Sequence, residues 1–186
     1  MVVKVETGQF PDWFEAFKQK HDLASIPEAI RPDFVDFLLQ RAAVRSIYEA
    51  IPENKFDEKI GEGDSVCQEL IHQIGHSRLR IEGLQAGKVT SWQYFDVHPQ
   101  EHQKLTHMSK DELMREFDAI SVSLYELFIR TETQTINVLL PYGRTVSGAR
   151  LLEEIVHHEI LHLGICIKLG DHLGITRPTP VKRVWG

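Results

Sequence analysis

The sequence predicts an all-α protein, a four-helix bundle with an extra short helix at the N-terminus. Four segments carry apolar residues at the three- and four-residue spacing of an amphipathic helix, and no segment shows the convincing alternation of a strand. A long connection, from Gln85 to Met108, separates the second segment from the third. Four helices of this length, with one long connection, describe a bundle whose apolar faces meet in a single core.

The first two predicted helices have recognisable ends. The first covers residues 33 to 51, with a proline on either side. The second starts after Asp64 or Ser65, either of which could cap it, and ends near Gly83. The first helix offers six candidate core residues: Phe34, Phe37, Leu38, Ala42, Ile47 and Tyr48.

The other two predicted helices start at serine residues. Ser109 and Glu112 form a capping-box pattern at the start of the third helix, which continues to about Arg130. The fourth helix starts around Ser147 and continues to about His172. It is the longest of the four and carries the motif on which the functional argument rests.

Aromatic residues near the N-terminus recur at i, i+3, i+4 and i+7: Phe10, Trp13, Phe14 and Phe17. This stripe predicts a short amphipathic helix that packs onto the bundle, with a contact in a homodimer as the alternative. We therefore divide the chain into an N-terminal extension, residues 1–31, and a bundle domain, residues 32–186. The stretch from Val89 to His107, rich in His, Pro, Gln and aromatic residues, could cover a site or a partner surface.

Composition narrows the function classes. The 186 residues are 42% hydrophobic and 26% charged, the balance of an ordinary globular domain. The formal net charge is −6 and no stretch clusters lysine and arginine, so we expect no nucleic-acid partner. No apolar run approaches a membrane span and the N-terminus lacks an apolar signal core, so we expect a cytoplasmic protein without membrane contact. Cys67 and Cys166 are too far apart to suggest a disulfide framework.

The most informative motif is His158-Glu159-Ile160-Leu161-His162 in the fourth helix. Its two histidines are four residues apart, so they lie one turn apart on one helical face, where both rings can hold one metal ion. Apolar residues before and after the pair fall on the same stripe, so the rings point toward the interior or its margin and need partners there. A metal ion is one such partner, and hydrogen bonding to a neighbouring helix is the alternative.

The second helix offers a complementary ligand. His72 and His76 are again four residues apart and share a face. The main apolar stripe of this helix, centred on Leu70, Ile74 and Ile81, lies almost opposite His72. Either the helix buries two sides, or His72 lines an open cleft. The cleft suits a reactive metal, which keeps a coordination position free for water or substrate.

A zinc protease is the first hypothesis for this metal site. The motif spells the H-E-x-x-H pattern of that class. In the longer form of the pattern, however, Gly164 falls one position early and Lys168 stands where the last histidine belongs. No glutamate follows Glu159, and the sheet that such proteases place beside this helix is not predicted. The protease hypothesis is therefore weak.

A di-iron carboxylate bundle is the second hypothesis. Two Glu-x-x-His pairs, at residues 69–72 and 154–157, match part of its ligand set. Such a site also needs an inward-facing glutamate from each remaining helix, and these helices offer only poorly placed ones. In addition, His157 points away from the face of the fourth helix that carries the other two imidazoles.

The third hypothesis is a mononuclear site of His72, His158 and His162, with His76 as an alternative to His72. Three blocks of the sequence occur in a characteristic order. The first is the segment from Ser65 to Ile74, with its serine, glutamate-leucine and histidine; the second is the histidine pair followed by Leu-Gly; the third is the exit Leu-Gly-Ile-Thr-Arg-Pro behind the last helix. In these three blocks the chain resembles the DinB-like (YfiT-like) family of metal-binding four-helix bundles.

The resemblance covers roughly residues 33 to 180 and implies a fold and a function class. The implied helix order is up-down-down-up, which the long second connection also permits. The implied cofactor is one divalent metal ion, such as zinc, nickel, iron or manganese. The implied activity is that of a metal-dependent hydrolase or a transferase of low-molecular-weight thiols, acting on a small-molecule substrate. The chain departs from the family in one block, because Leu163-Gly164-Ile165 stands where members often carry Arg-Gly-Gln.

Three neutral imidazoles would leave the ion its full charge and a free position, so that the pKa of a bound water falls to about 7 or a thiolate can bind. Glu159 is the candidate catalytic residue, as a proton acceptor or a ligand-orienting group, with a solvated helix position as the alternative. Glu69 is a candidate acceptor for a ring N–H. Cys166 is either a further ligand or a small buried hydrophobic residue. The contrasting function class is a non-catalytic bundle with structural histidines or a structural metal.

Overall fold

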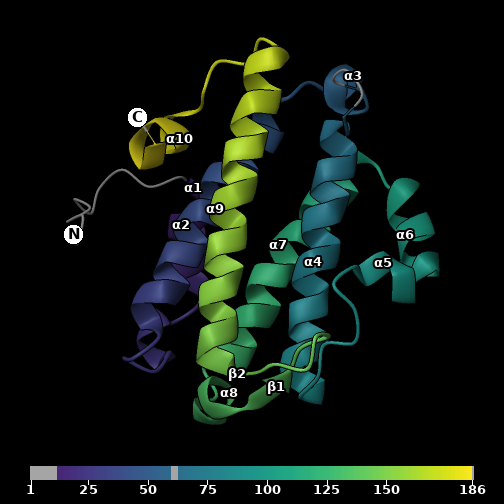
Figure 1. Cartoon of the computed structure of the whole chain (residues 1–186). Coiled ribbons are helices and arrows are strands. Elements are labelled where there is room, and N and C mark those ends of the chain that lie inside the picture. Colours follow the sequence, from purple (N-terminus) through teal and green to yellow (C-terminus); the bar gives the residue numbers. More distant parts are fainter. Residues whose placement is uncertain (1–11, 60–62, 186) are drawn as a thin grey trace.

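Four long helices form the body of the protein in the computed structural model, which describes residues 12–59 and 63–185 (Figure 1). They are α2 (Arg31–Ala50), α4 (Val66–Ala86), α7 (Lys110–Phe128) and α9 (Gly148–His172). The predicted all-α bundle is confirmed, and each expected helix lies within a few residues of its predicted bounds. None of the helices in the described ranges is both long enough and apolar enough to cross a membrane.

Serine side chains fix where three of these helices begin. Ser65 forms a capping box with Gln68 at the start of α4, and Ser109 forms one with Glu112 at the start of α7. Ser147 accepts a hydrogen bond from a backbone N–H in the first turn of α9. Each side chain satisfies N–H groups that have no partner inside the helix, and this local chemistry explains why the starts could be predicted.

The end of α4 differs from the prediction. The helix continues past Gly83 to Ala86, because Gly87 is the residue with the left-handed conformation that ends it, at φ 69°. Gly83 has a different purpose. A Cβ at this position would lie 2.5 Å from Cγ2 of Val89, so the missing side chain lets the following segment pack closely against the helix.

The long helices run up, down, down and up (Figure 1). The Lys110 ammonium at the start of α7 donates to the Ile51 carbonyl just behind the end of α2, so these two helices are antiparallel. The Lys55 ammonium of α3 (Glu53–Phe56) donates over 2.8 Å to the Leu173 carbonyl just behind α9, so α9 ends at the same end of the bundle as α2. This is the order that the resemblance implied.

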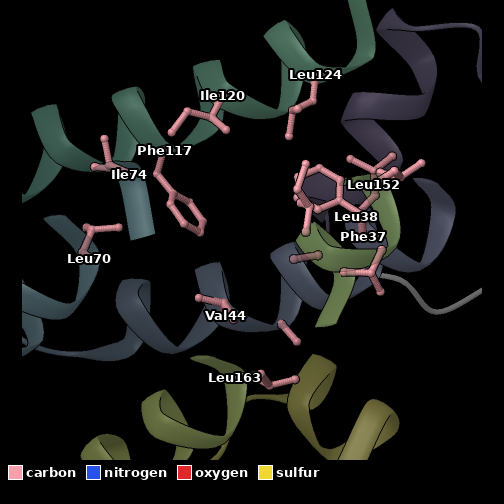
Figure 2. Packing of buried hydrophobic residues seen from close by; sticks show 14 of the residues in the cluster. Phe37, Leu38, Val44, Leu70, Ile74, Phe117, Ile120, Leu124, Leu152 and Leu163 are labelled. Carbon is pink, nitrogen blue, oxygen red and sulfur yellow. The ribbon is translucent and has the colours of Figure 1, made fainter. Parts of the chain in front are cut away.

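Apolar side chains from all four long helices meet in one core (Figure 2). Val44 of α2, Leu70 and Ile74 of α4, Phe117 of α7 and Leu163 of α9 all belong to it. The six core residues predicted for the first helix are confirmed, with exposed fractions of 2% or less. Burial of a large apolar side chain contributes about 1.5–3 kcal/mol, so this core is the main source of stability.

The connections carry short elements that the sequence pattern did not reveal. Two strands, β1 (Asn137–Leu139) and β2 (Thr145–Ser147), pair as an antiparallel hairpin. The sequence showed no convincing strand at these positions, because a three-residue strand is too short to show an alternating pattern. The stretch from Val89 to His107 contains α5 (Tyr94–Val97) and α6 (Pro99–Thr106), which lie beside α4 (Figure 1). The remaining short helices are η1 (Leu23–Ser25), α8 (Thr131–Thr135) and α10 (Thr179–Trp185).

The N-terminal helix α1 (Asp12–Lys20) packs onto the bundle. Phe14 and Phe17 are only 3% and 6% exposed, and the Tyr125 hydroxyl of α7 donates to a carbonyl just behind α1. Phe10, the first member of the aromatic stripe, lies outside the described residues. The packing agrees with the expected N-terminal extension. The division of the chain at residue 31 stays a prediction.

The close packing of α9 against α8 at Gly148 can be tested by substitution. A Cβ at Gly148 would lie 1.8 Å from the backbone oxygen of Thr133 in α8. We therefore expect Gly148→Ala to lower the free energy of unfolding by about 1–3 kcal/mol in urea denaturation. Gly164→Ala, in the same helix but with open space around its Cβ, should be neutral or stabilising by up to ~1 kcal/mol. Equal stabilities of the two variants would contradict this packing.

Candidate metal centre

Three histidines come together where α4 and α9 lie side by side. One ring nitrogen from each of His72, His158 and His162 lies within 4.8 Å of the other two. The Nε2 atoms of His158 and His162 are 2.9 Å apart. Nitrogens bound at 2.0–2.1 Å to one zinc-like ion lie roughly 3.3 Å from each other in a tetrahedral site. The spacing therefore fits three ligands of one ion, and these are the three residues that the sequence analysis put forward.

The site is closed at one end and open at the other. His162 is 4% exposed, His158 is partly buried and His72 is exposed. The His72 ring faces both others, with its centroid 5.0 Å from that of His162 and 5.8 Å from that of His158. His72 is thus at the surface of the cluster, on the solvent side of the buried His162 ring.

A buried carboxylate orients the innermost ring. Nδ1 of His162 makes a short hydrogen bond to Oε1 of Glu69, which lies three residues before His72 on α4. A carboxylate can only accept, so Nδ1 carries the proton and Nε2 presents its lone pair to His158. The expected role of Glu69 as an acceptor for a ring N–H is thus seen in the structure. Such contacts fix the tautomer and the orientation of metal-binding histidines.

The carboxylate is itself held in place from the core. The Gln73 side-chain amide donates to Oε1 of Glu69 over 3.1 Å and to the Tyr48 hydroxyl over 2.6 Å. Tyr48 belongs to α2 and is fully buried. A chain of polar contacts therefore runs from α2 through α4 to His162 on α9. The position of the innermost ring depends on the packing of three helices.

Two imidazoles of the cluster, His158 and His72, have lowered pKa values. Burial, followed by the charges of His162 and His72, lowers the pKa of His158 from 6.5 to about 2. Burial and the charge of His162 also lower the pKa of His72. A ligand nitrogen must be free of its proton before it can bind a metal ion. These two rings satisfy that condition at pH 7.

His76, the alternative third ligand, has a different position. Its ring stacks on that of His158 with a centroid distance of 3.2 Å and an angle of 5° between the planes. Among the described residues the group with converging ligand atoms contains His72 and not His76. Burial lowers the pKa of His76 well below its ordinary value, so an uncharged ring stacks on His158.

Glu159, the predicted catalytic residue, lies in the core. It is 1% exposed, and its Oε1 lies 3.2 Å from Nη2 of Arg41, which is fully buried. The expected alternative, a solvated position, was wrong. Nη2 of Arg41 also donates to the Ser77 hydroxyl, and the guanidinium lies 3.9 Å from the centre of the Phe117 ring. Burial raises the pKa of Glu159, while the charge of Arg41 opposes that rise.

The remaining candidate ligands lie outside the cluster. Cys166 is 1% exposed and its thiol lies 3.3 Å from the Tyr48 hydroxyl, so it is a small buried residue rather than a ligand. His157 is exposed and joins no metal-like group in the described part of the chain, which leaves the di-iron hypothesis without its second histidine. Sequence reasoning missed Arg41, whose only sequence cue is a basic residue inside the apolar stripe of the first helix.

The fold of this chain is similar to that of a solved structure. No protein-family model matches the chain, and no curated protein does. The crystal structure of a DinB-like protein, YjoA from Bacillus subtilis, is similar to this chain, with a TM-score of 0.61 and 20% sequence identity. The match covers 80% of this chain and 96% of that chain. The protein therefore has the fold of a DinB-like protein, and the resemblance drawn from its motifs is confirmed at the level of the fold.

The contact between Glu69 and His162 can be tested by removing the charge of the acceptor. We expect Glu69→Gln to weaken the binding of Zn²⁺ by about 10–100-fold, because a neutral amide holds the ring N–H less firmly. Titration against a competing chelator dye measures this change. Glu82→Gln on the same helix, which loses only a pair with His98, is the control and should bind like the wild type. An unchanged affinity in Glu69→Gln would show that this carboxylate does not orient the ligand.

Proposed function

We propose that the protein binds one divalent metal ion through His72, His158 and His162 and acts as a metal-dependent hydrolase or a transferase of low-molecular-weight thiols. The observation that carries this proposal is the convergence of His158 Nε2 and His162 Nε2 at 2.9 Å, with Nδ1 of His162 tied to Glu69. Two ring nitrogens lie this close either when one donates a hydrogen bond to the other or when both lone pairs bind one cation. The DinB-like fold supports the same assignment.

The residues around the cluster fit such an ion. When bound, the ion would supply Lewis-acid chemistry, lowering the pKa of a water or thiol at its free position. Glu69 would keep the proton of His162 on Nδ1, so that Nε2 is free to bind the ion. Stacking on His76 would fix the orientation of the His158 ring. The exposed side at His72 would admit a small-molecule substrate, with thiols among the candidates.

Glu159 keeps its place in this proposal as the proton acceptor. Its pKa is raised by burial, and a carboxylate with a raised pKa is better matched to proton transfer near neutral pH. Its contact with Arg41 in the core favours a second interpretation, in which Glu159 holds α2 against α9. The two roles predict different results for one substitution.

The second candidate function is a non-catalytic bundle stabilised by its metal. The observation that favours it is the continuous polar chain from Tyr48 through Gln73 and Glu69 to His162. An ion bound at the end of this chain would stabilise the packing of three helices even without turnover. Metal content alone does not separate the two functions, so activity has to be measured as well.

Elemental analysis of untagged protein tests the ion itself. We expect about one divalent ion per chain in the wild type, and its loss in His158→Ala because a ligand is removed. His76→Ala should keep the ion, since His76 only stacks on the cluster. Thermal unfolding gives an independent readout, because an ion present at 100 times its Kd stabilises the folded state by roughly 2.7 kcal/mol. Absence of any bound ion in the wild type would sink the proposal, and two ions would restore the di-iron hypothesis.

Activity on a panel of substrates separates the enzyme from the structural bundle. Metal-loaded protein is assayed for ester and amide hydrolysis and for transfer of small thiols to an electrophile. We expect Glu159→Gln to lower kcat by about 100-fold with metal content unchanged, as for loss of a general base. Retained kcat together with a lower unfolding midpoint would assign Glu159 to packing with Arg41. No turnover on any substrate would favour the non-catalytic bundle.

A further inference from the structure

Arg80 of α4 is a buried cation with two nitrogens that make no hydrogen bond to any described residue. It is 5% exposed, and its Nε and Nη1 atoms are buried with no hydrogen-bond partner among the described residues. A guanidinium carries five N–H donors, and buried donors are almost always paired in folded proteins. An unpaired one calls for a specific explanation. The structure holds no such partner for Arg80 within the chain it describes.

Arg80 continues the row of histidines on α4. It follows His72 and His76 at four-residue spacing, which places it about 6 Å from His76 and about 12 Å from His72 along the helix axis. Burial is the main reason that the pKa values of His76 and His158 are lowered, and the charge of Arg80 adds to both shifts. The guanidinium therefore lies close enough to the imidazole cluster to act on it.

No carboxylate of the described residues forms an ion pair with Arg80. Glu154, one turn before His158 on α9, is the acidic group whose charge acts on it. The two side chains form no ion pair, and the Glu154 carboxylate lies 3.9 Å from Nε of Arg150 instead. A buried arginine is normally held by a planar acceptor that matches its fork of donors. Among the described residues, no such acceptor lies within hydrogen-bond distance of Nε or Nη1 of Arg80.

An aromatic pair covers the guanidinium. The Trp92 ring lies 4.9 Å from the central carbon of Arg80 and stacks on Tyr142 at 5.2 Å. Trp92 comes from the segment between α4 and α5, and Tyr142 from the turn between β1 and β2. Both rings are themselves exposed, 39% for Trp92 and 59% for Tyr142. Large apolar side chains held at the surface by loops are typical of the walls of ligand sites.

We propose that Arg80 is an anion-binding subsite, walled by Trp92 and Tyr142, that takes a carboxylate or phosphate of the substrate. This inference rests on the proposed function, because it places the reacting group of the same molecule at His72, His158 and His162. The spacing along α4 sets the size of that molecule. Arg80 follows the ligand His72 by two helical turns, about 12 Å along the axis, so the substrate that reaches both is a small, extended anion.

Anion binding to metal-free protein tests this subsite apart from the metal. EDTA-treated protein is titrated with succinate in one arm and inorganic phosphate in the other, at constant ionic strength set with chloride. Calorimetry gives the affinity, and the difference in tryptophan fluorescence between the wild type and Trp92→Phe reports on Trp92, one of three tryptophans in the chain. We expect binding in at least one arm and a change in emission, and the arm with the higher affinity identifies the anion.

Variants of Arg80 decide whether the guanidinium is the binding group. Arg80→Met, which keeps the length of the side chain, should weaken binding by tenfold or more, as for loss of charge-assisted hydrogen bonds. Arg80→Lys keeps the charge without the fork and should bind several-fold more weakly than the wild type. It also keeps the test valid if the Met variant does not fold. Arg78→Met, whose arginine already pairs with Glu101 and Glu116, is the matched control and should bind normally.

The outcomes separate the two proposals. Succinate and phosphate binding that is equally strong in wild type, Arg80→Met and Arg80→Lys would overturn the subsite, as would no binding in either arm. A lower unfolding midpoint in Arg80→Met with unchanged anion affinity would also overturn it, since Arg80 would then serve only to pack against Trp92. None of these readouts needs a bound metal. The proposed function fails instead when the wild-type protein takes up no ion.

Discussion

The hydrogen bond between Glu69 and His162 is the contact on which the rest of the site depends. It joins α4 to α9 in the buried half of the cluster and decides which nitrogen of His162 is free. Gln73 and Tyr48 extend it to α2, so the rotation of three helices about their axes is fixed by one polar chain. These hydrogen bonds compensate for the burial of the polar groups, and a rotated helix would break several of them together.

The orientation of α4 explains why the cluster is exposed on one side. Helix α4 turns its apolar stripe, with Leu70 and Ile74, into the core, and this leaves His72 on the opposite margin of the helix. On helix α9, His162 is buried, and the burial of His158 is intermediate between that of His162 and that of His72. The cluster thus spans the boundary between core and solvent. His162 is held by its hydrogen bond to Glu69, and His72 is exposed to solvent. An ion that keeps one coordination position free for water or substrate requires such an arrangement.

Features carried by local sequence chemistry could be predicted, and features that depend on distant partners could not. Serine caps and a four-residue histidine spacing are encoded within one helix, so the starts of α4, α7 and α9 and the three-histidine group were found. Glu159 was placed by its neighbours in sequence, but its environment is set by Arg41, more than a hundred positions away. Gly83 was taken for a helix end because its packing against Val89 cannot be seen in the sequence.

Two buried arginines show how far tertiary context decides chemistry. Arg41 and Arg80 both lie on bundle helices and both lie against aromatic rings. Arg41 receives a carboxylate from Glu159 and a hydroxyl from Ser77, so its charge is balanced inside the core. Arg80 receives only Trp92, and an aromatic face offsets a small part of what a guanidinium loses on leaving water. Nε and Nη1 are buried without a hydrogen-bond partner among the described residues in both arginines, but only Arg41 has a carboxylate beside it. Arg80 is therefore the cation whose charge is left for an anion to balance.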